Sequence, residues 1–182
     1  MPSESLAAPC TCNPRFRYVA KRLRAILAGL ALVGPMCTVA GHLPGRVVRV
    51  LDGDRIVIDQ RGVQTQIALA GIDAPELNQP WGQTAAAELY RTLGGAFVVV
   101  ETATGNRNGV YGRIVFESRD IALDLLRLGL AWSTEPRDPG DARPHPYNVA
   151  EESARAARRG LWSDPTPIPP WEWRRHGPDA AD

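Results

Sequence analysis

Two neighbouring segments, 55–60 and 63–69, each place large apolar residues at every second position, Ile56 and Ile58 in the first and Ile67 and Leu69 in the second, on either side of the dipeptide Arg61-Gly62. Period-two alternation is typical of strands with one buried face. The short polar dipeptide predicts a hairpin with a two-residue turn. Counting outward from that turn predicts that Arg55 lies opposite Ala68 and that both side chains point to the same face.

Further along the chain, strand-like and helix-like patterns alternate. AFVVVE at 96–101 and YGRIVFE at 111–117 are rich in β-branched and aromatic residues, which predicts a second pair of strands. QTAAAELYRTL at 83–93 is dense in strong helix formers, and DIALDLLRLGL at 120–130 places leucines on one helical face. We therefore expect a helix at each of these two segments.

A third helix is predicted near the end of the chain. Asn148 is expected to cap it, Glu151 to complete a capping box, and Gly160 to end it. The preceding segment, 135–147, has four prolines and is expected to be an irregular loop. Together these patterns predict an α+β, mainly β domain, in which a five-stranded Greek-key barrel carries about three packed helices.

The first 40 residues have a different pattern. Basic residues precede the apolar run AILAGLALV at 25–33, and TVA, ending at Ala40, offers the small residues of a cleavage site. We predict a signal peptide at 1–40, which makes the mature protein secreted or periplasmic. An uncleaved anchor is the alternative, although nine apolar residues are short for a span of about 20. The expected organisation is completed by a domain at 41–175 and a tail at 176–182.

Removal of the predicted leader would change the cysteine and charge composition of the mature domain. Cys10, Cys12 and Cys37 all precede the proposed cut, so the mature domain would hold no disulfide and no cysteine-based metal site. It would carry 16 basic and 19 acidic residues, which argues against a broad cationic face for nucleic acid. Every cation left is an arginine, a side chain suited to bidentate phosphate contacts.

Four acidic residues occur in two predicted turns. Asp52 and Asp54 lie in LDGD, and Asp73 and Glu76 lie in GIDAPE. Carboxylate and carbonyl oxygens suit calcium or magnesium, and two aspartates from separate turns leave room for water and a phosphate. The alternative is that both sequences only make turns, since aspartate is common there.

Five motifs combine these residues in a familiar order. They are VLDGDR (50–55), ALAGIDAPE (68–76), VYGR (110–113), GLAW (129–132) and ARAARRGLW (154–162). In order and spacing they resemble the thermonuclease, or staphylococcal nuclease-like, family over about residues 45–175. This resemblance implies an oligonucleotide-binding (OB-fold) barrel.

The resemblance also implies an activity, namely calcium-dependent hydrolysis of phosphodiester bonds in DNA and RNA. It gives roles to six residues: Ca²⁺ ligands Asp54, Asp73 and the carbonyl of Ala74; the water-activating Glu76; the phosphate-binding Arg113; and Tyr111, which contacts substrate or only packs. Phosphodiester hydrolysis needs a positioned nucleophile and neutralisation of charge on the phosphoryl oxygens, which these residue types can supply. We expect a monomer with nucleic acid as its substrate.

The chain departs from the family pattern at informative positions. The arginine expected before LxGIDAPE is Ala68, the threonine expected after DGD is Arg55, and the acidic residue usual before YGR is missing from NRNGVYGR. Because Arg55 is predicted to lie opposite Ala68, its guanidinium could approach the same phosphate and act in catalysis. The alternatives are a solvated Arg55 and a catalytically weakened domain that binds nucleic acid or an envelope component without cleavage.

Overall fold

The computed structural model describes residues 41–103, 110–140 and 142–177, and the predicted leader lies outside the described residues. The strands are β1 (Gly41–Val50), β2 (Arg55–Gln60), β3 (Val63–Leu69), β4 (Ile72–Asp73), β5 (Phe97–Ala103), β6 (Val110–Phe116), β7 (Arg119–Asp120) and β8 (Trp132–Ser133). The helices are α1 (Gly82–Leu93), α2 (Ile121–Leu128), α3 (Pro146–Ala156), the 3-10 helix η1 (Gly160–Ser163) and α4 (Pro170–His176).

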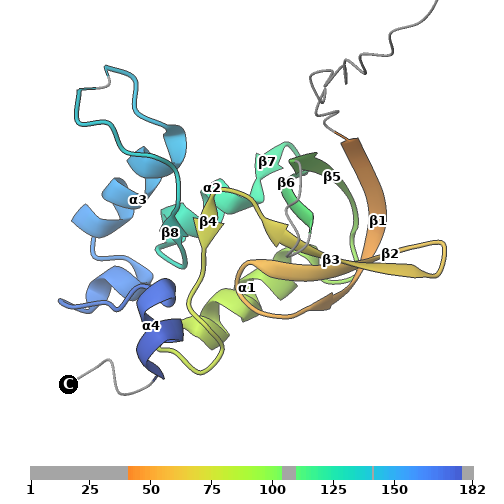
Figure 1. Ribbon diagram of the computed structural model, residues 1–182, viewed down its shortest axis with the longest axis horizontal. Coiled ribbons are helices and arrows are strands. Elements are labelled where there is room, and N and C mark those ends of the chain that lie inside the picture. Colours follow the sequence, from red (N-terminus) through yellow and green to blue (C-terminus); the bar gives the residue numbers. More distant parts are fainter. Residues whose placement is uncertain (1–40, 104–109, 141, 178–182) are drawn as a thin grey trace, which may run out of the picture. The chain divides into compact units, whose positions relative to one another are not determined.

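Five of the strands close into a barrel. They run in the order β3-β2-β1-β5-β6, with antiparallel neighbours, and a parallel pairing of β3 with β6 closes the circle. Figure 1 shows the barrel strands on one side, and α3 and α4 on the side away from the β2–β3 hairpin. The predicted α+β fold with a five-stranded OB-fold barrel is confirmed.

The β2–β3 hairpin has the predicted register. Gln60 pairs with Val63 across a two-residue turn in which both Arg61 and Gly62 have positive φ, 55° and 87°. These are the values of a type I′ turn, whose twist matches that of the flanking strands. The same register places Arg55 opposite Ala68, as predicted.

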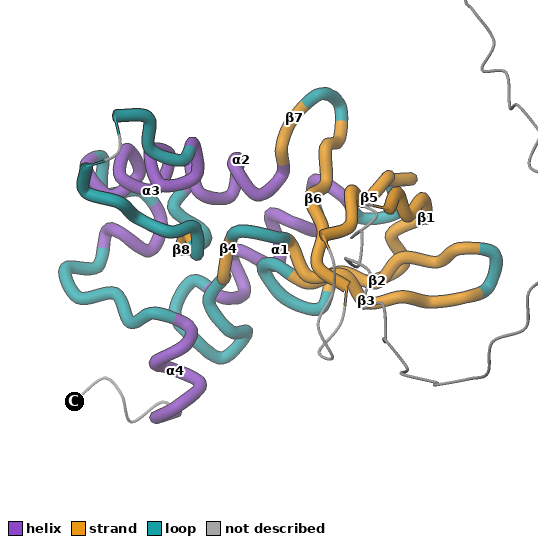
Figure 2. Tube along the Cα trace, turned by 45° about the horizontal axis from the view of Figure 1, so that its top comes forward, coloured by secondary structure: helices purple, strands orange, loops and turns teal. Residues whose placement is uncertain are grey.

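Apolar side chains from strands and helices form one main core. The inward-facing isoleucines of the hairpin, Ile56, Ile58 and Ile67, are fully buried. Leu89 of α1 and Leu125 of α2 pack into the same cluster. Figure 2 shows α1 and α2 next to the barrel strands. The barrel is therefore a filled core, and its chemistry must lie at its turns and outer face.

The start of the third helix was predicted incorrectly. α3 begins at Pro146, and the N-cap is His145, whose Nδ1 accepts a hydrogen bond from the Tyr147 backbone N–H. Asn148 lies inside the helix, and its amide donates to the Pro136 carbonyl. The buried Glu151 accepts from the backbone N–H of Ser133 in β8. Tertiary hydrogen bonds to β8 and the preceding loop therefore replace the local capping box.

The number of helices also exceeds the prediction. Four α-helices are described instead of about three, because the segment after η1 forms the additional helix α4. Trp132, Trp162 and Trp171 build a second, smaller core, with ring centroids 4.3 and 5.6 Å from that of Trp132. Among the residues described, no helix is long and apolar enough to cross a membrane.

Candidate active site

The turn between β1 and β2 presents Asp54. The Asp54 backbone N–H donates to Asp52 Oδ1 at 3.2 Å, and its carbonyl accepts from the Leu69 N–H at 2.8 Å. A Cβ added at Gly53 would come within 2.6 Å of Ala85 in α1 and 2.7 Å of Ala74. A glycine between the two aspartates therefore lets this turn pack closely against both α1 and the next turn.

A second turn lies directly against the first. β4 carries Asp73, which pairs with Trp132 of β8. The next residue, Ala74, donates its backbone N–H to Asp54 Oδ2 at 2.9 Å. The two turns that sequence predicted to share a site are thus joined by a hydrogen bond, and this bond sets the orientation of the Asp54 carboxylate.

Glu76 follows on a short loop that leads into α1. Its N–H donates to Gln79 Oε1 at 3.2 Å, and its carbonyl accepts from the Gln79 N–H at 2.8 Å. A Cβ at Gly82, the first residue of α1, would lie 1.8 Å from the Glu76 carbonyl oxygen. Only a glycine at that position permits this packing, so the helix start positions the Glu76 loop.

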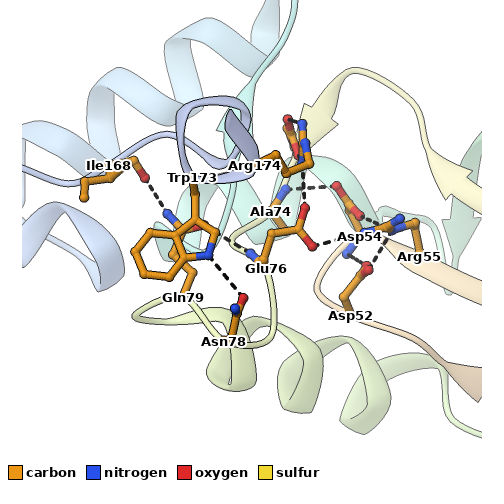
Figure 3. Close-up of polar contacts among 11 residues, drawn as sticks. Asp52, Asp54, Arg55, Ala74, Glu76, Asn78, Gln79, Ile168, Trp173 and Arg174 are labelled. Carbon is orange, nitrogen blue, oxygen red and sulfur yellow. Dashed lines mark hydrogen bonds and ion pairs between the residues drawn. The ribbon is translucent and has the colours of Figure 1, made fainter. Parts of the chain in front are cut away.

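Arg55 points into the carboxylates of these turns. Its Nε lies 2.6 Å from Asp52 Oδ2 and 3.7 Å from Asp54 Oδ1, and its Nη2 lies 3.3 Å from Glu76 Oε2 (Figure 3). The solvated, isolated Arg55 considered from sequence is therefore wrong. Arg55, which stands where the family has threonine, lies in the same cluster as the predicted cation ligand Asp54 and the predicted base Glu76.

Tyr111 and Arg113 lie on the outer face of β6. The parallel register pairs Tyr111 with Ala68, so Arg55, Ala68 and Tyr111 form one row across three strands. Arg113, two residues on, points to the same exposed face. It forms ion pairs with Asp120 at 2.7 Å and Glu101 at 3.5 Å. The structure thus places Arg113 near this row but gives it no contact with the Asp54 and Glu76 carboxylates.

Arg174 of α4 is a residue that the sequence did not point to. Its Nη1 donates to Asp73 Oδ1 at 3.1 Å and to Glu76 Oε1 at 2.7 Å, and its Nη2 donates to Asp73 Oδ2 at 2.7 Å. About 100 residues separate it from its partners, so no local pattern could have revealed the contact.

The electrostatics of the cluster favour a cation. Side-chain exposures of Asp54, Asp73 and Glu76 are only 13, 16 and 20%. Burial, together with the neighbouring Asp52 and Asp73, raises the pKa of Asp54 to about 8, although the hydrogen bond from the Ala74 N–H opposes this shift. Desolvation and like charges disfavour the ionised form of a carboxylate, and a bound cation would relieve both effects.

The oxygen donors fit a hard divalent cation. Asp54 and Asp73 contribute carboxylates from two joined turns, and calcium sites commonly add backbone carbonyls and waters. In the described part of the chain, no group of three or more His, Cys, Asp or Glu side chains is arranged to hold a metal. Two carboxylates alone would need further oxygen ligands, such as a backbone carbonyl and water, to complete the coordination of calcium.

Comparison with known proteins identifies the family. Residues 66–164, more than half of the chain, match the sequence model of the family described as "Staphylococcal nuclease homologue". The chain belongs to the staphylococcal nuclease family. This membership agrees with the five-stranded barrel and with the predicted resemblance.

Relatives within this family extend beyond the matched region. An Escherichia coli protein named "Uncharacterized endonuclease" is 36% identical over 135 residues, which cover 71% of this chain and 84% of that protein. "Protein ParB" of Escherichia coli is 32% identical over 92% of this chain and 98% of its own. "Micrococcal nuclease" of Shigella flexneri is 33% identical over 88% of this chain and 96% of its own. The family and the two relatives with nuclease names support a nuclease function.

Proposed function

We propose that this protein is a calcium-dependent nuclease that hydrolyses phosphodiester bonds of DNA and RNA. The observation that carries the proposal is the junction of the two turns through the Ala74–Asp54 hydrogen bond. It brings Asp54, Asp73 and Glu76 to one place together with Arg55. Nuclease names among the relatives support the same reaction class.

Asp54, Asp73 and the Ala74 carbonyl would hold the cation. Bound there, calcium would neutralise charge that builds on the phosphoryl oxygens. Asp54 is held for this role by the Ala74 N–H, which leaves its other oxygen, Oδ1, facing Arg55 at 3.7 Å. The joined turns would keep these ligands in place before substrate arrives, which reduces reorganisation during the reaction.

Glu76 would orient and deprotonate the attacking water. Its carboxylate is mostly buried, and its loop is held by Gln79 and by the close approach of Gly82. A base must be positioned within hydrogen-bond reach of its water, and this loop provides such a rigid support. Arg55, hydrogen-bonded to Glu76 Oε2, would add positive charge beside the phosphate.

The row of Arg55, Ala68 and Tyr111 across the three strands would bind the phosphate backbone of the nucleic acid. Tyr111, 37% exposed, and Arg113 lie on the same face of β6 beside Ala68. Arginine offers a planar pair of donors for phosphate oxygens. A nucleic-acid chain bound along this row would reach the carboxylate cluster at Arg55, which lies next to Ala68 in the row.

A direct assay tests the proposal. Purified protein is incubated with heat-denatured DNA and with RNA, in calcium or in chelator, and release of acid-soluble nucleotides is measured. We expect release only with calcium and its loss in both Asp54→Ala and Asp73→Ala. Calcium titration by calorimetry should show weaker binding in both variants, and unchanged binding would remove these ligands from the proposal.

The loss of the family arginine at Ala68 favours one other candidate, a weakened domain that binds nucleic acid without cleaving it. The same assay separates the two functions. Binding of single-stranded DNA in chelator, with no nucleotide release in calcium, would support the binding function and contradict the nuclease.

A further inference from the structure

The guanidinium of Arg174, in helix α4, contacts both the proposed cation ligand Asp73 and the proposed base Glu76. Arg174 makes three hydrogen bonds, two to Asp73 and one to Glu76. Figure 3 shows Arg174 beside Glu76. The arginine side chain remains 47% exposed, so a substrate can reach it from solution.

α4 is held at this place by contacts that do not involve Arg174. The buried Trp173 donates its indole N–H to Asn78 Oδ1 at 3.1 Å. Just before the helix, the Ile168 carbonyl accepts from Gln79 Nε2 at 2.6 Å. Both partners belong to the loop that follows Glu76, as Figure 3 shows. The Arg174 side chain can therefore leave the carboxylates while the helix stays in place.

Arg174 donates to both oxygens of Asp73, so its guanidinium competes with a cation for this carboxylate. In the described part of the chain, the ion pairs described for four carboxylates, Asp52, Asp54, Asp73 and Glu76, involve two arginines, Arg55 and Arg174, so carboxylates outnumber arginines in this cluster. Partly exposed ion pairs contribute little to stability and are readily exchanged. A cation at Asp73 would thus release Arg174 next to the bound phosphate.

We propose that Arg174 is a phosphate-binding arginine of this site, which moves from Asp73 and Glu76 to the substrate phosphate when the cation binds. This inference rests on the proposed nuclease function. It supplies a further cation, besides Arg55 and Arg113, to a site that lacks the family arginine at Ala68. Arg174 already contacts the proposed base and a proposed cation ligand. A short rotation of its side chain would therefore bring its guanidinium to a phosphate held between these two residues. Its planar fork suits two phosphate oxygens.

The test compares Arg174→Gln and Arg174→Lys with Arg175→Gln. Arg175 is the exposed neighbour on the same helix and takes no part in the ion pairs described for the site. At saturating calcium, Arg174→Gln should lower kcat/KM roughly 100-fold, as expected for loss of a group that stabilises developing charge. Arg174→Lys should recover part of the activity, and Arg175→Gln should match the wild type.

A second readout does not depend on turnover. Without substrate, calorimetry should show calcium binding tightened up to about fivefold in Arg174→Gln, because an exposed competitor for Asp73 is gone. Unchanged or increased kcat/KM in Arg174→Gln would overturn the assignment and indicate an inhibitory contact. Lower activity with unchanged calcium affinity and a reduced melting temperature would overturn it in favour of a structural ion pair.

The proposal can fail separately from the nuclease function. If the wild type binds DNA but does not cleave it, the nuclease function is wrong. Binding of a fluorescein-labelled single-stranded oligonucleotide in calcium then tests Arg174, since Arg174→Gln should weaken it and Arg175→Gln should not. Equal binding by the two variants would overturn the phosphate role of Arg174.

Discussion

Asp54 illustrates at the scale of one residue how burial and function oppose each other. Its carboxylate is 13% exposed and lies near Asp52 and Asp73, and the pKa is raised to about 8 from 3.8. Ionised Asp54 is therefore unfavourable in the metal-free fold. Asp54 is nevertheless held in this position by both turns. Its backbone N–H donates to Asp52 in its own turn, and its carboxylate accepts from the Ala74 N–H in the next turn.

This raised pKa predicts how metal-free stability depends on pH. Between about pH 4 and pH 8 the folded state retains a proton on Asp54 that the unfolded state has lost, so stability falls as pH rises through this window. We expect Asp54→Asn to show a flatter fall in melting temperature, measured in chelator from about pH 5 to about pH 8. Equal slopes for the two proteins would contradict the shift.

A second prediction concerns Glu76. If it deprotonates the attacking water, Glu76→Gln should reduce turnover by roughly 100-fold or more. The amide keeps the size of the side chain, so calcium affinity and circular dichroism should change little and serve as controls. A folded variant with wild-type turnover would remove Glu76 from the mechanism.

Arg55 and Ala68 form a testable pair because they lie opposite each other in the hairpin. If Arg55 replaces the missing arginine, Arg55→Thr should be severely impaired, and adding Ala68→Arg should recover much of the loss. Hydrolysis rates of both single variants and the double variant decide this. An active Arg55→Thr variant would end the compensation hypothesis.

At the scale of elements, the start of α1 controls the Glu76 loop. The Gly82 backbone N–H donates to the Gln79 carbonyl, and the Glu76 carbonyl packs where a Gly82 side chain would lie. The loop is held on its other side by the segment that leads into α4. Two elements far apart in the chain therefore position one proposed catalytic carboxylate.

Gly82→Ala should displace this loop. The added Cβ would lie 1.8 Å from the Glu76 carbonyl oxygen, and moving this backbone aside costs free energy. We therefore expect a lower melting temperature. We also expect activity to fall by a larger factor than calcium affinity. Gly140→Ala is the matched control, since its Cβ would meet only Asp138 Oδ1 at 3.5 Å. Equal behaviour of the two variants would show that the loop tolerates the added methyl group.

At the scale of the whole molecule, the carboxylate cluster and its two arginines combine three parts of the chain. Residues 52–55 and 73–76 come from the two turns, and Arg174 comes from the far end of the described residues. Phosphate contacts are therefore expected to be local, as the excess of acidic residues after residue 40 already indicated. A site of this kind does not need a broad basic surface.

The leader yields the remaining prediction. We propose that residues 1–40 direct export and are removed, because a basic segment, an apolar run and TVA occur in that order. N-terminal sequencing of the exported protein should begin at Gly41. Met1 or Pro2 at the terminus of the exported form would contradict cleavage, and recovery in the membrane fraction would favour the anchor.

Sequence alone determined what depends on local chemistry. The Arg61-Gly62 turn and the alternation around it were enough for the hairpin register, since the two-residue turn fixes the pairing and the period of two then places Ile56, Ile58 and Ile67 on the buried face. The family motifs were enough for the barrel. Only the tertiary structure decided the start of α3, where Glu151 bonds to β8, and the contacts of Arg174. Both depend on desolvated hydrogen bonds and ion pairs between distant segments, which no local sequence pattern encodes.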